Sequence, residues 1–191
     1  MVRVVNAVNQ APQTPQTPQT VPGTRDAGPL TTAVLIEAAS SVLDPELPVV
    51  TLGELGIIRG VTRTEDGAIE VVITPTYVGC PATEAIAADV RAAVAAFAGG
   101  TEVRTRTVLS PAWSTDWITE SGRRKLADHG IAPPTGTRAV RGGPVSVELT
   151  VRCPRCASAD TRLISRFGST PCQSLRACRS CGEPFGALKP L

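Results

Sequence analysis

The sequence has little net charge, few aromatic side chains and one histidine in 191 residues. A net charge of +2 gives no electrostatic basis for binding nucleic acid or an anionic membrane, which require a basic excess. No apolar segment of the length of a signal peptide follows Met1, and no run approaches a membrane span. We therefore expect a soluble cytoplasmic protein with no membrane partner.

Familiar catalytic patterns are also missing. The sequence contains no glycine-rich phosphate loop, no Ser–His–Asp set and no pair of catalytic carboxylates. His129 falls at the end of a predicted helix, where it suits a contact with the helix dipole better than base catalysis. An enzyme acting alone is poorly supported, and we expect no catalytic site in this chain.

Cysteine, by contrast, follows a pattern. Cys153 and Cys156 form one CxxC pair, and Cys178 and Cys181 form a second. Two thiolates from one tight turn reach a single ion, and two such turns complete a tetrahedral S₄ site, for which Zn²⁺ is the usual occupant. In a reducing compartment this pattern favours metal binding over two disulfides. Iron accepts the same four ligands, so the sequence does not choose between zinc and iron.

Composition divides the chain into four parts. Residues 1–29 carry a Thr-Pro-Gln repeat without apolar side chains to bury, and we expect them to be disordered. Residues 30–132 are expected to form one domain, and residues 133–144, rich in proline and glycine, a linker. Residues 145–191 have too few large apolar side chains to fold without a metal, which agrees with a zinc ribbon of short β-strands.

Within the first domain, apolar periodicity predicts the order αββαβα, an α/β (α+β) fold class. The first helix starts at Thr31 or Thr32, and Asp66-Gly67 supplies a tight hairpin turn between the first two strands. The predicted strands cover 57–64, 68–74 and 101–109, and the later helices cover 80–97 and 115–128.

Cys80 lies between the second strand and the second helix. We expect it at or near the helix N-cap, where free N–H groups and the helix dipole lower a thiol pKa. Thr74 and Thr76 are close enough in sequence to offer hydroxyl donors. Cys80 would then be a nucleophile, a redox thiol or a transient ligand for iron or an iron–sulfur cluster. A buried thiol that only fills the junction between strand and helix is an equal alternative.

Three other features have more ordinary interpretations. Asp44 and Glu46 could reach the same end of the sheet, although a helix C-terminal turn with solvated charges is favoured locally. At least one of Trp113 and Trp117 is expected in the core. Cys172 has no CxxC partner, and we leave it out of the four-ligand site.

The first domain resembles the MIP18 (DUF59) iron–sulfur assembly family. The matching segments are 44–48, 52–53, 55–58, 74–76 and 79–82, which include Asp44, Thr74, Thr76 and Cys80. With segments 110–118, 122–126, 130–134 and the ribbon end 181–185, nearly everything after residue 30 resembles the PaaD (PaaJ) family of phenylacetyl-CoA epoxidase subunits. Cys172 also falls where this family carries a cysteine.

The resemblance implies an accessory role in aerobic phenylacetate degradation. Other subunits of the epoxidase system are the di-iron oxygenase and the flavin/iron–sulfur reductase, and this subunit would mature or insert the iron–sulfur cluster of the reductase. Cys80 would hold iron or a cluster transiently, with Asp44 in support. A structural subunit of the monooxygenase is the alternative. A nucleic-acid-binding ribbon ranks third, because Phe167 and Phe185 are its only aromatics.

Overall fold

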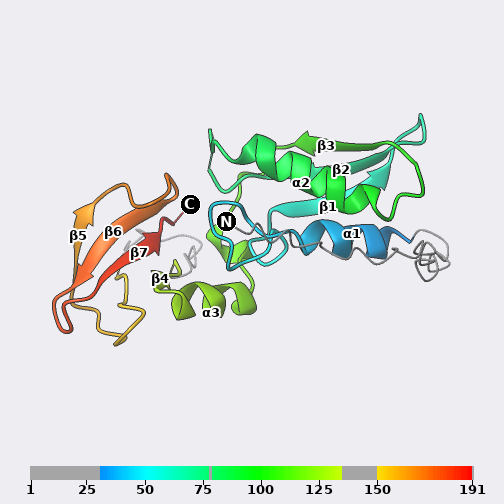
Figure 1. Cartoon of the computed structure of the whole chain (residues 1–191). Helices are drawn as coiled ribbons and strands as arrows, with labels where there is room; N and C mark the ends of the chain where they lie inside the picture. The colour runs from blue at the N-terminus through cyan, green and yellow to red at the C-terminus, as the bar shows by residue number, and fades with distance from the viewer. Residues whose placement is uncertain (1–30, 78, 135–149, 191) are drawn as a thin grey trace, which may run out of the picture.

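A computed structural model describes residues 31–77, 79–134 and 150–190 (Figure 1). The predictions for residues 1–29 and for most of the linker 133–144 lie outside these ranges. The elements are α1 (Thr32–Ser40), β1 (Ile58–Arg63), β2 (Ile69–Ile73), α2 (Thr83–Ala95), β3 (Val103–Thr107), a 3₁₀ turn (Thr115–Trp117), α3 (Glu120–Asp128), β4 (Ile131–Ala132), β5 (Thr161–Ser165), β6 (Gln173–Cys178) and β7 (Pro184–Leu188). The α+β class and the αββαβα order are confirmed. Within the described ranges, no helix has the length and apolar character needed to span a membrane.

The first sheet has the order β1-β2-β3, with β2 antiparallel to β1 and parallel to β3. The predicted hairpin turn is present, and Gly67 adopts a φ of +86° there. The side chains of Ile69, Val71 and Ile73 on β2 are fully buried, because α1 and α2 pack against this sheet (Figure 1). β2 is therefore the central strand of the first domain.

The third helix begins later than predicted. The Ser114 hydroxyl accepts a hydrogen bond from the Asp116 N–H (3.2 Å) and caps the short 3₁₀ turn. The chain then becomes extended at Ile118, and the Thr119 hydroxyl caps α3 by accepting from the Gly122 N–H (3.0 Å). The prediction of a single helix over 115–128 is wrong at its start, because two separate caps divide this segment into a 3₁₀ turn and α3. The predicted end of the helix is confirmed, since α3 ends at Asp128.

The tryptophan segment packs on the loop that leads into β1. Trp113 is buried, and its indole N–H donates to the carbonyl of Leu55 (2.8 Å), which confirms the prediction that one tryptophan lies in the core. Trp117 is half-buried beneath the guanidinium of Arg59, which lies 3.7 Å from the ring centroid. These contacts fix the loop before β1 against the start of α3.

The second sheet has the order β4-β7-β6-β5. Neighbouring ribbon strands are antiparallel, whereas β4 runs parallel to β7 with Ile131 opposite Gly186. Because β4 follows α3 almost directly, the chain before the linker adds a strand to the ribbon. A small second core lies in this part and consists of Ala132, Cys153, Cys178, Phe185 and Ala187.

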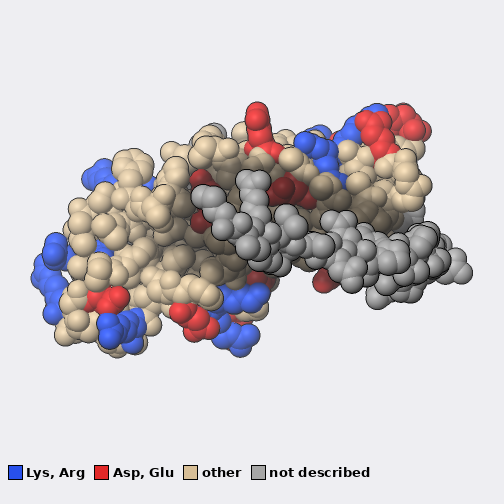
Figure 2. Space-filling model, viewed as in Figure 1, with Lys and Arg blue, Asp and Glu red and all other residues tan. Residues whose placement is uncertain are grey.

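The ribbon also packs against the first domain. Cys172 and Leu188 are buried in the same apolar cluster as the core of the first domain, and Ile131 packs against it. In Figure 1 the C-terminus, where β7 ends, lies beside the loop that precedes β1. Figure 2 shows both basic and acidic side chains on the outer surface of the ribbon. The two parts therefore meet through apolar side chains.

Candidate functional site

The four paired cysteines come together as their spacing predicts. All four sulfur atoms lie within 4.8 Å of one another, with Cys153 Sγ 3.8 Å from Cys181 Sγ and Cys156 Sγ 3.5 Å from Cys178 Sγ. None of the four is in a disulfide. Four Zn–S bonds of about 2.3 Å place the sulfurs of a tetrahedron about 3.8 Å apart. We call these four residues the quartet, and their geometry fits one metal ion.

Two thiols of the quartet, Cys178 and Cys156, have pKa values shifted in opposite directions when no cation is bound. Backbone N–H groups of Cys181 and Ser180 lower the pKa of Cys178 to about 6. For Cys156, the backbone N–H of Ser158 favours the thiolate, but the thiols of Cys181 and Cys178 raise its pKa to about 12. A bound divalent cation favours the thiolate form of every ligand, including Cys156. The donor set therefore fits a metal, and both zinc and iron accept it.

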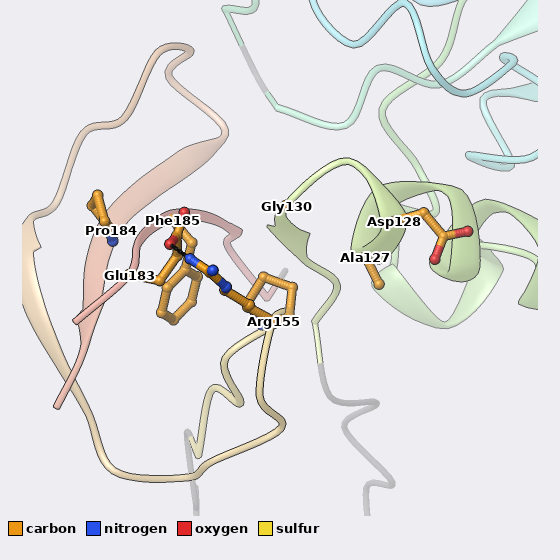
Figure 3. Close-up of a pocket in the computed structure, with 8 residues that line it drawn as sticks. Ala127, Asp128, Gly130, Arg155, Glu183, Pro184 and Phe185 are labelled. Atoms are coloured by element: carbon orange, nitrogen blue, oxygen red, sulfur yellow. Dashed lines mark hydrogen bonds and ion pairs between the residues drawn. The ribbon is translucent and has the colours of Figure 1, made fainter. Parts of the chain in front are cut away.

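A cleft of about 470 Å³ opens beside the quartet, between the ribbon and the end of α3 (Figure 3). Its ribbon side carries the exposed Arg155–Glu183 ion pair, and Asp128 lies on the α3 side. Exposed ion pairs contribute little to stability. The residues that line the cleft are Ala127, Asp128, Gly130, Pro154, Arg155, Glu183, Pro184 and Phe185, and they include no cysteine. We assign it no chemistry.

Cys80 does not lie at the helix N-cap. The N-cap of α2 is Ala82, and the Cys80 carbonyl accepts hydrogen bonds from the N–H (3.2 Å) and the hydroxyl (2.8 Å) of Thr83. Burial raises the pKa of Cys80, a hydrogen bond from the Ala82 backbone lowers it, and the charges of Glu46 and Asp44 raise it further. The net direction is upward. Cys80 therefore lies near the N-cap, as predicted, but the predicted lowering of its pKa is wrong, because burial and the two carboxylates outweigh the hydrogen bond from the Ala82 backbone.

Asp44 and Glu46 form the acidic side of this site. Asp44 is only 6% exposed, and its Oδ1 accepts hydrogen bonds from the N–H groups of Glu46 (2.8 Å) and Leu47 (2.9 Å). Burial raises the pKa of Asp44, and these two hydrogen bonds lower it by a smaller amount. Glu46 Oε2 lies 3.9 Å from Cys80 Sγ. The expectation that both charges are solvated is wrong for Asp44, because its carboxylate closes a buried turn.

Thr74 and Thr76 line a neighbouring cavity of about 320 Å³. The other lining residues are Pro75, Tyr77, Leu109, Ala112 and Trp113, and Cys80 is not among them. Thr74 is 1% exposed, and its hydroxyl has no hydrogen-bond partner within the described ranges. The structure therefore brings Cys80, Glu46 and Asp44 together and leaves the two threonine hydroxyls on a separate, mostly apolar cavity.

Thr74→Val is expected to raise the free energy of unfolding by about 1 kcal/mol. A buried hydroxyl without a partner carries a desolvation cost of about 1–3 kcal/mol, and valine has nearly the same shape. Urea denaturation measures the change. Thr76→Val is the control, because Thr76 is half-buried and should change stability by less than about 0.5 kcal/mol. A loss of stability in Thr74→Val would mean that its hydroxyl has a partner.

Two residues near Cys80 were missing from the set of site residues predicted from the sequence, Glu46 and Cys172. Cys172 is 8% exposed, and the Thr170 hydroxyl lies 3.0 Å from its sulfur. Burial raises the pKa of Cys172, Thr170 lowers it, and the charges of Glu46, Asp44 and Cys80 raise it again. A ribbon thiol is therefore buried in the apolar cluster of the first domain. The one sequence feature that pointed to Cys172 was its match to a cysteine position of the PaaD family, because Cys172 belongs to no CxxC pair.

Comparison with known proteins covers both parts of the chain. Residues 32–105 match the family model described as "Iron-sulfur cluster assembly protein". Residues 138–189 match the model described as "PaaD zinc beta ribbon domain". The first match contains Asp44, Glu46 and Cys80, and the second contains the quartet and Cys172.

The chain is 46% identical over 150 residues to a component of the "Putative 1,2-phenylacetyl-CoA epoxidase" of Escherichia coli (strain K12), covering 78% of this chain and 87% of that protein. It is 33% identical over 92 residues to "Fe-S protein maturation auxiliary factor" of Porphyromonas gingivalis, covering 48% of this chain and 87% of that protein. A solved DUF59 domain from Bacillus anthracis has 27% identity and a TM-score of 0.45, covering 50% of this chain and 90% of that one. With 46% identity across most of both chains and a match to the PaaD ribbon model, the chain belongs to the PaaD family.

Proposed function

We propose that this chain is an accessory subunit of a phenylacetyl-CoA epoxidase system that matures or inserts the iron–sulfur cluster of a partner subunit. The names of its relatives support both halves of the proposal, since one is an epoxidase subunit and others are iron–sulfur maturation factors. The partner that best fits this role is the subunit that carries flavin and iron–sulfur groups, the reductase. The reducing cytoplasm, which keeps thiols free, is the compartment we assign.

The observation that carries the proposal is the pairing of Cys80 with Glu46, 3.9 Å apart, in the part of the chain that matches the iron–sulfur assembly model. A thiol and a carboxylate are both ligands for iron. Because burial and the nearby carboxylates raise the Cys80 pKa, a proton competes with iron for the sulfur. That competition favours temporary holding and release over permanent binding.

The quartet has a different role in this proposal. We infer that it holds Zn²⁺ as a structural ion, because four thiolates complete a tetrahedral shell and leave no position open for a reacting group. The ribbon would then be a folded platform that docks on the first domain. The cargo would be held near Cys80 and not at the quartet.

Cys80→Ala is expected to leave the fold intact and to lower the cluster content of the partner reductase several-fold. The test is to produce the reductase together with each version of this chain and to measure its iron and acid-labile sulfide. Glu84→Gln is the matched control, because Glu84 is exposed in the first turn of α2 and its replacement removes a charge close to Cys80 in sequence. A fully loaded reductase with Cys80→Ala would contradict the proposal.

A structural role in the oxygenase complex is a second candidate, and one surface favours it. Leu163, Ile164 and Phe167 are exposed on or beside β5, which is one of the two edge strands of the ribbon sheet. Exposed apolar side chains on an edge strand fit a protein partner. This role predicts stoichiometric co-purification with the oxygenase and full complex activity with Cys80→Ala, which separates it from the maturation role.

A further inference from the structure

The outer edge of the ribbon exposes three large apolar side chains within five residues of chain. Leu163 and Ile164 on β5 are each 46% exposed, and Phe167 just after β5 is 65% exposed. β5 lies on the side of the ribbon away from the first domain (Figure 1). Apolar side chains that are exposed together mark surfaces that contact another molecule.

Three arginines flank these apolar side chains. Arg162 and Arg166 are exposed on either side of them along β5, and Arg176 of β6 lies opposite Leu163 in the ladder. None of the ion pairs formed among the described residues includes any of the three. The Nε of Arg176 is also buried without a hydrogen-bond partner in the described part of the chain. Because an unpaired buried donor costs stability, it points to an acceptor that binds here.

The acidic residues of the ribbon lie elsewhere. Residues 145–191 have seven basic and three acidic side chains, so the ribbon cannot balance all its arginines. Glu183 pairs with Arg155, and Asp160 Oδ1 lies 3.9 Å from Arg179 Nε, both beside cysteines of the quartet. Excess positive charge thus collects around the exposed apolar side chains, and a partner that complements it is acidic. We call this surface the β5 patch, and it consists of Arg162, Leu163, Ile164, Arg166, Phe167 and Arg176.

A second copy of this chain is a poor occupant of the β5 patch. A two-fold contact places the same patch on both subunits, so arginines would face arginines, and like charges in an interface oppose binding. Addition of a partner strand is also disfavoured. The ladder of β5 is irregular between Leu163 and Ser165, and bulges and charged side chains protect edge strands from pairing. The patch therefore favours a contact through side chains with an acidic partner.

Nucleic acid also offers negative charge, but the β5 patch lacks what it needs. Single-stranded nucleic acid is held by aromatic rings on which successive bases stack, and Phe167 is the one aromatic residue of the patch. The Lys189 ammonium already lies 4.4 Å from the centroid of that ring. A protein surface covers aliphatic side chains with its own apolar groups and offers carboxylates around them. Leu163 and Ile164, between two arginines, fit a protein partner of that kind.

We propose that the β5 patch is the surface through which this chain docks on the partner reductase, and that the reductase presents carboxylates around an apolar centre. This inference rests on the proposed maturation role and adds the place of contact. The docking surface is on the ribbon, whereas the proposed cargo residues Cys80 and Glu46 belong to the first domain. Docking and cargo binding should therefore be lost independently of each other.

The test is a calorimetric titration of the purified reductase, prepared without its cluster, into the full-length chain with zinc in the quartet. It is carried out at low and at high salt with wild type, Arg162→Glu and Phe167→Ala. Arg124→Glu is the matched control, because Arg124 is exposed on α3 and the charge reversal is the same. Zinc content and thermal midpoint verify that each variant is folded.

Arg162→Glu is expected to weaken binding about tenfold at low salt, Phe167→Ala about fivefold, and Arg124→Glu less than about twofold. Wild-type affinity should fall as salt rises, and the affinity of Arg162→Glu should fall less, because an attraction that salt screens has been removed. Equal affinities of Arg162→Glu and Arg124→Glu overturn the inference. A wild-type chain that does not bind the reductase overturns it as well.

Further arms of the experiment test other occupants and separate docking from the maturation role. The inference is overturned if wild type binds a short DNA duplex more tightly than the reductase. It is also overturned if sedimentation shows a dimer that Phe167→Ala dissociates. Cys80→Ala is expected to bind the reductase like wild type. If the reductase is fully loaded with Cys80→Ala while Arg162→Glu still weakens binding, the docking surface stands and the maturation role fails.

Discussion

Cys153→Ser is expected to abolish metal binding at the quartet and to unfold the ribbon. Structural zinc sites contribute about 10–16 kcal/mol of apparent binding free energy, and that energy is folding energy for a domain with little core of its own. The buried residues of the ribbon are few, and two of them, Cys153 and Cys178, belong to the quartet. Zinc analysis and the loss of dispersed ribbon amide signals by NMR measure the effect.

Cys172→Ser is the matched control for this experiment, because it removes a thiol from the same part of the chain but outside the quartet. It should keep one metal per chain and a folded ribbon. The first domain should remain folded in Cys153→Ser, with a lower thermal midpoint, because Leu188 no longer packs into its core. A ribbon that stays folded after Cys153→Ser, or after removal of metal by a chelator, would show that the quartet is not structural.

Features that depend on neighbouring residues were predicted well from the sequence. The quartet follows from two CxxC turns, and the hairpin follows from Asp66-Gly67, where Gly67 supplies the positive φ. The order of helices and strands follows from apolar periodicity, which is also local. The error at the start of α3 is local as well, since Ser114 and Thr119 both had the chemistry of a cap and periodicity did not separate them.

The arrangement around Cys80 depends on contacts that no local pattern contains. From the sequence, Asp44 was interpreted as a solvated charge at the end of a helix. In the structure, the loop that follows folds over Asp44 and buries it. Cys172 reads as a spare thiol, because the element that faces it lies in the other part of the chain. β4 joins the ribbon sheet through only two residues. Two residues are too few to show the apolar–polar alternation that predicts a strand. Burial and long-range pairing thus decided the features that sequence reasoning missed.

Gly56→Ala is expected to lower the free energy of unfolding by about 2–5 kcal/mol. Gly56 has a φ of +71°, which costs a residue with a side chain about 1–2 kcal/mol. An added Cβ would also lie 2.6 Å from the Cβ and 2.8 Å from the carbonyl oxygen of Trp117, so backbone has to move, at about 1–3 kcal/mol. Guanidinium denaturation measures the loss, which is large against the stability of an ordinary domain, about 5–15 kcal/mol.

Two other glycines separate the two costs. Gly67 has a positive φ (+86°), and no atom lies within 4 Å of an added Cβ. Gly67→Ala should therefore lower the free energy of unfolding only by the cost of the positive φ, about 1–2 kcal/mol. Gly53→Ala has no positive φ, but its Cβ would lie 2.6 Å from the Ser40 Cβ, so it should lose only the steric part. If Gly56→Ala lowers the free energy of unfolding by no more than Gly67→Ala does, then Trp117 has shifted to make room for the new methyl group. The loop that carries Gly56 would then be held in place by contacts other than the one with Trp117.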